Sequence, residues 1–203
     1  MALCLNNLAF FHSVAGRLDE SEVEFEEALG LFRRLAAANP EVYKGDMARS
    51  IGNLAFLHSW RNRMDVAERE YEEAVSIYRR LFEANPEVYE NDVARNLCGL
   101  AFLHFCMGKS HLAEKECEDA LVIYHSLAEK NTNAGTSNVA EMLLIISGLL
   151  DALPSGGTMV IPKIVELMKI YRMCDAHNLQ MFAEKINIVS EWLKGHGVSV
   201  EQH

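Results

Sequence analysis

The chain has 203 residues, half of them hydrophobic, and a formal net charge of −10 at pH 7. This charge argues against a surface for nucleic acid or for anionic membranes, because both need a basic face. The sequence contains no uninterrupted run of about 18 apolar residues that could span a membrane, and its N-terminus lacks the basic region and long apolar run of a signal peptide.

The sequence repeats itself in one register through three successive units. Leu8-Ala9-Phe10-Phe11-His12 returns as Leu54-Ala55-Phe56-Leu57-His58 and again as Leu100-Ala101-Phe102-Leu103-His104, so the period is 46 residues. A fixed period of this length indicates a stacked array in which each unit contacts only its neighbours. Such an array presents a long surface, and this favours a binding function over a catalytic one.

The first unit starts directly at a helix, because Met1 aligns with Met47 of the second unit. No segment precedes this helix as a cap. This favours either a fragment of a longer array or multidomain protein, or self-association at this end. A second helix follows, and Asp19 is its expected N-cap.

The second unit shows how one repeat is built. Asp46 is the expected N-cap of a first helix, helix A, over about Met47–Arg61. Asp65 then caps a second helix, helix B, which ends at Asn85-Pro86 because the residue before a proline is pushed out of the helical region. Each repeat is therefore a helical hairpin followed by a short connector. The expected N-caps of helix A in the next two units are Asp92 and Asn138.

The fourth unit is degenerate. Val139–Ala152 still has the pattern of helix A, and a B-like helix is expected over about Met159–Met173. A last helix over about Asp175–Lys194 is expected to cover the end of the stack. We thus predict one solenoid domain over residues 1–203, with repeats at about 1–46, 47–92 and 93–138, a degenerate repeat at 139–174 and a capping helix at 175–194.

The residue pattern within each unit resembles that of the tetratricopeptide repeat (TPR) family. In the second unit it runs Ile51-x2-Leu54-Ala55-x2-His58, then Ala67-x3-Tyr71-x2-Ala74, then Pro86. The usual unit has about 34 residues, so this chain is similar to the long-repeat subgroup that includes the kinesin light chain arrays. The resemblance implies an all-α fold, a right-handed α-α superhelix (solenoid) of TPR helical hairpins with about nine helices.

No motif indicates an enzyme. The sequence has neither a glycine-rich phosphate loop nor a nucleophile elbow, and the pairs Glu26-Glu27 and Glu72-Glu73 predict a solvated helix face. A recurring histidine occupies the place where TPR proteins usually carry tyrosine. Equivalent residues of successive repeats lie about 10 Å apart, too far to share one metal ion, so packing is favoured over a metal or pH-sensing role. These histidines are His12, His58 and His104.

The five cysteines show no paired spacing and fall mostly at apolar helix positions. We therefore expect free thiols in a reducing, cytoplasmic environment, with neither a metal nor a cofactor bound. The cysteines are Cys4, Cys98, Cys106, Cys117 and Cys174.

The resemblance implies that helix A lines a concave groove that binds a peptide. Asn7 and Asn53 resemble the asparagines that hold a peptide backbone in long-repeat arrays, and an amide side chain offers both a donor and an acceptor. Arg49 and Arg95 could pair with a carboxylate. The recurring phenylalanines either form an apolar floor for the ligand or are buried against the next helix. The expected groove residues are Asn6, Asn7, Phe10, Arg49, Asn53, Phe56, Trp60, Arg95 and Phe102.

The sequence thus predicts a protein–protein interaction module that holds a peptide or a partner helix in its concave groove, as part of a larger protein. The alternative is a homo-oligomerisation or regulatory segment of a signalling protein, which would use its uncapped N-terminal repeat as the contact. Neither hypothesis involves nucleic acid, a membrane or catalysis, and the identity of the protein partner does not follow from the sequence.

Overall fold

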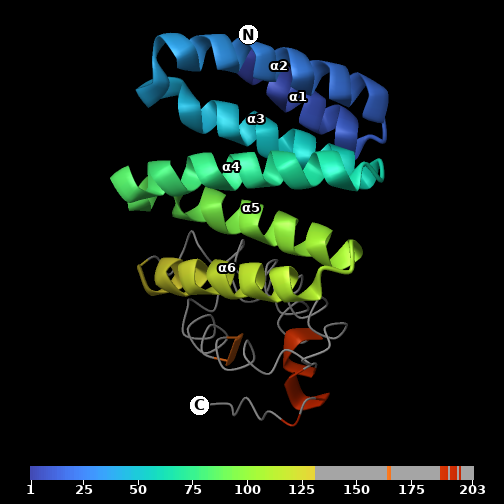
Figure 1. The fold of residues 1–203 in the computed structure, drawn as a ribbon, viewed down its shortest axis with the longest axis vertical. Helices are drawn as coiled ribbons and strands as arrows, with labels where there is room; N and C mark the ends of the chain where they lie inside the picture. Colours follow the sequence, from blue (N-terminus) through green and yellow to red (C-terminus); the bar gives the residue numbers. More distant parts are fainter. Residues whose placement is uncertain (131–163, 166–187, 192, 196, 198–203) are drawn as a thin grey trace, which may run out of the picture. The chain divides into compact units, whose positions relative to one another are not determined.

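The computed structural model describes residues 1–130, 164–165, 188–191, 193–195 and 197. The described part of the chain is helical and contains no strand, which confirms the all-α prediction. Among these residues, no helix is both long and apolar enough to cross a membrane. The six long helices are α1 (Ala2–Val14), α2 (Leu18–Ala38), α3 (Pro40–Trp60), α4 (Met64–Ala84), α5 (Pro86–Cys106) and α6 (Ser110–Lys130) (Figure 1).

The expected count of about nine helices is not confirmed, since six long helices are described. The helix expected over Val139–Ala152 lies outside the described residues. Of the B-like helix, only residues 164–165 are described, and both are helical. Residues 188–191 and 193–195 are also helical, in agreement with the expected last helix where the two overlap.

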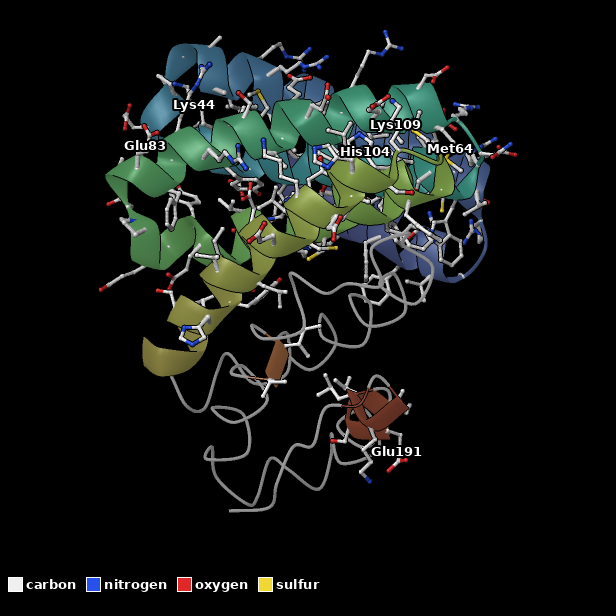
Figure 2. The ribbon with its side chains drawn as sticks, turned by 60° about the horizontal axis from the view of Figure 1, so that its bottom comes forward. Lys44, Met64, Glu83, His104, Lys109 and Glu191 are labelled. Atoms are coloured by element: carbon white, nitrogen blue, oxygen red, sulfur yellow. The ribbon has the colours of Figure 1, made fainter. Side chains whose placement is uncertain are left out.

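The chain divides into two compact units, residues 1–103 and residues 104–203. In the first unit, α1 packs against α2, α2 against α3 and α3 against α4, and α1 also meets α3 (Figure 1). Neighbouring helices are antiparallel. Figure 2 shows Lys44 of α3 and Glu83 of α4 at one end of this pair, and Met64, where α4 begins, at the other. This is the hairpin arrangement expected from the repeat.

Helix A starts earlier than predicted. Asp46 and Asp92 lie inside α3 and α5 rather than at their N-caps, because these helices begin at Pro40 and Pro86. Proline suits the first helical position, since its fixed φ matches the helix and its missing N–H is not needed there. The connector predicted after each helix B is therefore two more turns of helix A. Asn138, the third expected N-cap, lies outside the described residues.

The ends of helix B are close to those predicted. Asn39 and Asn85 follow the last residues of α2 and α4, so the stop signal before proline is confirmed. At the other end, Asp19 and Asp65 are the second residues of α2 and α4 instead of their N-caps. A carboxylate in the first turn still interacts favourably with the positive end of the helix dipole.

The turn between helices A and B is the same in each repeat. Gly16, Asn62 and Gly108 occupy equivalent positions and have φ values of 76°, 60° and 72°. Glycine and asparagine tolerate this left-handed conformation best. The next residue then donates its N–H to the carbonyl of the repeating histidine, as Arg63 does to His58 at 2.9 Å. The 46-residue period therefore governs the turns as well as the helix faces.

The core of the first unit is built from the repeat positions that the sequence marked as apolar. One cluster joins residues of α1, α2, α3 and α4. The alanines at equivalent positions of successive helices A, Ala9, Ala55 and Ala101, are fully buried at 0% exposure. Their complete burial agrees with the prediction that small residues mark the places where helices cross closely. The cluster consists of Ala9, Phe25, Leu29, Ile51, Leu54, Leu57 and Ala74.

Candidate functional site

The recurring phenylalanines are exposed on successive helices A. Phe10 on α1, Phe56 on α3 and Phe102 on α5 have exposures of 51%, 44% and 48%. The alternative that the next helix buries them is therefore wrong for this structure. In each of these repeats an apolar ring is thus about half exposed to solvent. Exposed hydrophobic surface that recurs in this way commonly marks a contact site.

Two close contacts bring these helices A side by side. Between α1 and α3, the Ser50 hydroxyl donates to the Asn6 side-chain oxygen at 3.0 Å, and the Asn53 amide donates to the same oxygen at 3.3 Å. Between α3 and α5, a Cβ placed on Gly52 would lie 2.4 Å from the Asn96 side-chain oxygen. The exposed faces of the three helices are thus parts of one surface.

Asn6 does not belong to that surface. Its side chain is buried at 4% exposure and accepts the two hydrogen bonds from α3. Its role is to hold α1 against α3, so we remove it from the expected ligand contacts. Asn7 is exposed and Asn53 is half-buried, which leaves both able to meet a ligand.

An aromatic pair extends the surface on α3. The Phe56 and Trp60 rings lie one helical turn apart, with centroids 5.4 Å from each other and planes tilted by 47°. Trp60 is 67% exposed. We name this set of exposed and half-buried residues the phenylalanine surface, and it comprises Asn7, Phe10, Arg49, Asn53, Phe56, Trp60, Arg95 and Phe102.

The two arginines of this surface already have acidic neighbours. Arg49 lies 3.2 Å from Asp46, and Arg95 lies 3.4 Å from Asp92. Burial raises the pKa of Asp92, although the charges of Arg95 and Arg49 oppose this rise. Exposed pairs of this kind contribute only about 0–1 kcal/mol, so either arginine can exchange its partner for a ligand carboxylate at little cost.

In the third repeat, Gly99 occupies the position that carries Asn7 and Asn53 in the first two repeats. A Cβ at Gly99 would lie 2.6 Å from two ring atoms of Tyr71, which is 5% exposed. In the third repeat, the Tyr71 ring of α4 thus lies against the backbone of α5 at the position where the first two repeats have an asparagine side chain. A glycine in the middle of an otherwise regular helix was the available sequence signal.

Each recurring histidine contacts a glutamate side chain, which supports the predicted packing role. In each repeat the histidine Nδ1 lies 2.7 Å from a glutamate oxygen twelve residues later, on the following helix B. The glutamates recur at the same period of 46 residues, so the sequence contained the signal for them, but we did not predict the pairing. The pairs are His12–Glu24, His58–Glu70 and His104–Glu116, and Figure 2 marks His104.

One carboxylate also links the first repeat to the second. Glu22 of α2 lies 3.4 Å from His58 Nε2, 2.8 Å from Arg61 and 2.5 Å from Arg63. Burial alone would raise the pKa of Glu22, but the hydrogen bond and charge of Arg63, with Arg61 and His58, outweigh burial and lower it. The α2–α3 contact is therefore apolar at its centre and charged at one end.

Glu22→Gln should destabilise the first unit at neutral pH by about 1–2 kcal/mol, because three cationic or polar partners lose a charged acceptor. A lowered pKa means that the folded state favours the carboxylate. The stabilisation is then present above the unfolded pKa, near 4.5, and is lost as pH falls through the folded pKa. Melting midpoints measured from pH 7 to pH 3 should converge for the two proteins at the acidic end.

The exposed Glu27 on the same helix is the matched control. Glu27→Gln should leave the melting midpoint within a small margin of the original at every pH. If the difference between Glu22→Gln and the original protein were unchanged by acid, Glu22 would not stabilise the contact through its charge.

The described cysteines are free thiols, as predicted, and Cys174 lies outside the described residues. Cys4 and Cys106 are exposed, whereas Cys98 and Cys117 are buried. Burial, reinforced by Glu116 and Glu114, raises the pKa of Cys117 to about 12. This thiol therefore stays protonated and behaves as a core residue.

The comparison with family patterns agrees with this repeat architecture over part of the chain. Residues 1–39 and 47–87 match the pattern of the tetratricopeptide repeat family. No curated protein is similar to the chain in sequence. Two solved structures from Podosopora anserina, described as nearly identical TPR-like repeats of a kinesin light chain, are similar over 95% of each chain, at 16% identity and TM-scores of 0.46 and 0.45.

Proposed function

We propose that the chain binds a polypeptide on the phenylalanine surface, because its residues 1–39 and 47–87 match the tetratricopeptide repeat, which is in general a protein-interaction module. The ligand is an extended peptide or a partner helix held in a concave groove formed by the helices A. The role is binding without catalysis.

The observation that carries the proposal is the exposure of Phe10, Phe56 and Phe102 at one position of three successive repeats. A single exposed apolar side chain would be ordinary. Three at equivalent positions on adjacent helices, with Trp60 beside the second, supply a continuous apolar contact for a ligand that runs across the repeats.

Polar groups next to the rings support peptide backbone recognition. Asn53 keeps hydrogen-bonding capacity beyond its single bond to Asn6, and Asn7 is exposed. Arg49 and Arg95 favour an acidic side chain or a terminal carboxylate, but Asp46 and Asp92 offset part of their charge. We therefore expect the apolar contact to contribute more affinity than the charges.

The test uses a displayed library of random linear peptides, selected against the whole chain. Peptides so obtained should bind Phe56→Ser at least about tenfold more weakly than the original protein, a loss near 1.4 kcal/mol. Trp60→Ala should have a comparable effect. Both side chains are well exposed, so the melting midpoint should stay within about 2 °C of the original.

Val23→Ser is the matched control, because Val23 is an apolar residue of α2 with 63% exposure and lies outside the helices A that form the phenylalanine surface. It should leave peptide affinity unchanged. If the selected peptides bound equally well to a variant with Ser at Phe10, Phe56 and Phe102, the phenylalanine surface would not be the binding site. Failure to select any peptide would count against linear-peptide binding.

The exposed free thiols Cys4 and Cys106 support the prediction of a reducing compartment such as the cytoplasm, since exposed unpaired cysteines are oxidised in secreted proteins. A thiol titration of protein purified under non-reducing conditions tests this.

A further inference from the structure

Helix α1 has a second exposed apolar face, separate from the phenylalanine surface. Leu8 and Phe11 are 45% and 70% exposed, and Met1 and Cys4 are exposed on the same face. These residues follow one another at steps of three and four and so form one stripe along the helix. Phe10 lies about 100° away around the helix from Phe11, on the neighbouring face.

The equivalent face of α3 is fully covered, and α2 covers it. Leu54 and Leu57, one period after Leu8 and Phe11, are 2% and 1% exposed. They belong to the same hydrophobic cluster as Phe25 of α2. The chain therefore contains its own example of what such a face binds, namely the apolar stripe of a helix B.

The basic residues at the charged end of this contact also recur one period earlier, on α1 and in the turn after it. His58 Nε2 on α3 and Arg63 in the turn after α3 both contact the Glu22 carboxylate. One period earlier stand His12 and Arg17. The Nδ1 of His12 pairs with Glu24, as that of His58 does with Glu70, which leaves its Nε2 in the position that meets Glu22 in the next repeat.

Arg17 pairs with a carboxylate of its own helix turn in place of one from a packed helix. It pairs with Glu20, three residues away, and both side chains are about half exposed, at 52% and 53%. A surface pair of this kind contributes little, so a better buried carboxylate could replace Glu20 without a large penalty.

We propose that the Leu8–Phe11 face of α1 docks an acidic amphipathic helix, in the way that α2 docks on α3. The partner helix has a carboxylate followed by large apolar residues three and seven positions later, the spacing of Glu22, Phe25 and Leu29. Its apolar residues cover Leu8 and Phe11, and its carboxylate pairs with His12 and Arg17.

Charge decides between this partner and a second copy of the same face. Residues 1–16 contain neither aspartate nor glutamate. Two copies of α1 packed against each other would therefore place no α1 carboxylate opposite His12 and Arg17. An acidic helix satisfies both groups, and electrostatic complementarity of this kind selects the correct partner at an interface.

The test uses a labelled synthetic peptide of residues 18–38, the α2 sequence, as a probe, because α2 has the required pattern. Fluorescence anisotropy with the whole chain should show saturable binding. Phe11→Asp should weaken this binding by at least about tenfold, and hydrogen exchange in residues 2–14 should slow when the peptide is bound. A peptide with Glu22→Gln should bind more weakly and with a smaller salt dependence.

Val122→Asp is the matched control, since it places the same charge on an apolar side chain that is 54% exposed on α6 and belongs to neither face, and it should leave peptide binding unchanged. Absence of binding overturns the proposal. Binding that Phe11→Asp leaves intact also overturns it, because the peptide would then have exchanged with α2. A dimer of the original chain in sedimentation equilibrium that Phe11→Asp abolishes would assign the face to a second copy and would likewise overturn it. None of these results depends on the phenylalanine surface binding a peptide.

Discussion

Gly99→Ala should destabilise the chain, because overpacking a tight contact usually costs about 1–3 kcal/mol. The new methyl group would lie 2.6 Å from ring atoms of Tyr71. The ring cannot move aside easily, because Tyr71 is buried at 5% exposure between helices. The gain in helix propensity, about 1 kcal/mol for Gly to Ala, offsets only part of this cost. Thermal unfolding followed by circular dichroism should show a lower midpoint.

Gly30→Ala is the matched control, because the chemical change is identical and Gly30 is also inside a helix, α2. A Cβ there would meet no atom within 4 Å. The midpoint should therefore rise, by the propensity gain of up to about 1 kcal/mol. If both variants shifted the midpoint in the same direction, the close approach of α5 to Tyr71 would not be a determinant of stability.

Ala55→Leu should destabilise the chain by at least about 1–3 kcal/mol. Ala55 is 0% exposed at the crossing of α3 with α4, and Ala67 on the facing helix is also 0% exposed. The first repeat shows how close this crossing is, since Ser21 of α2, equivalent to Ala67, donates a hydrogen bond to the Ala9 carbonyl at 2.7 Å. Three additional carbon atoms cannot fit without separating the helices.

Ala37→Leu provides the comparison, because Ala37 is exposed near the end of α2. Both residues have high helix propensity, so this change should alter stability by less than about 0.5 kcal/mol. Urea unfolding of both variants gives the two free energies. A cost for Ala55→Leu as small as that for Ala37→Leu would mean that the helices do not cross at this alanine.

The repeat itself was readable from the sequence. The period of 46 residues, the apolar frame and the helix B ends at Asn39 and Asn85 all agree with the structure. These features depend on local chemistry repeated in one register, namely side-chain periodicity and the conformational restriction before proline. The sequence prediction places the start of helix A too late because it treats proline only as a stop signal. At Pro40 and Pro86 it is also the first residue of the next helix.

The candidate site was only partly predictable. Position in the repeat correctly indicated that Asn7, Asn53 and the recurring phenylalanines lie on helix A. The same reasoning placed Asn6 in the groove, whereas its amide oxygen bridges α1 and α3. A sequence position fixes the direction of a side chain relative to its own helix. It does not fix how far the neighbouring helix is, and that distance decides whether the side chain is buried.

The sequence by itself determined the repeat unit, the antiparallel hairpins and the residues on each helix face, because these follow from the period and from local conformational preferences. The tertiary structure alone decided that Phe10, Phe56 and Phe102 remain half exposed, that Gly99 accommodates the Tyr71 ring, and that α1 presents uncovered the face that α2 covers on α3. The physical reason is that exposure and close approach depend on which other helix lies against a face, and this is a property of packing between repeats.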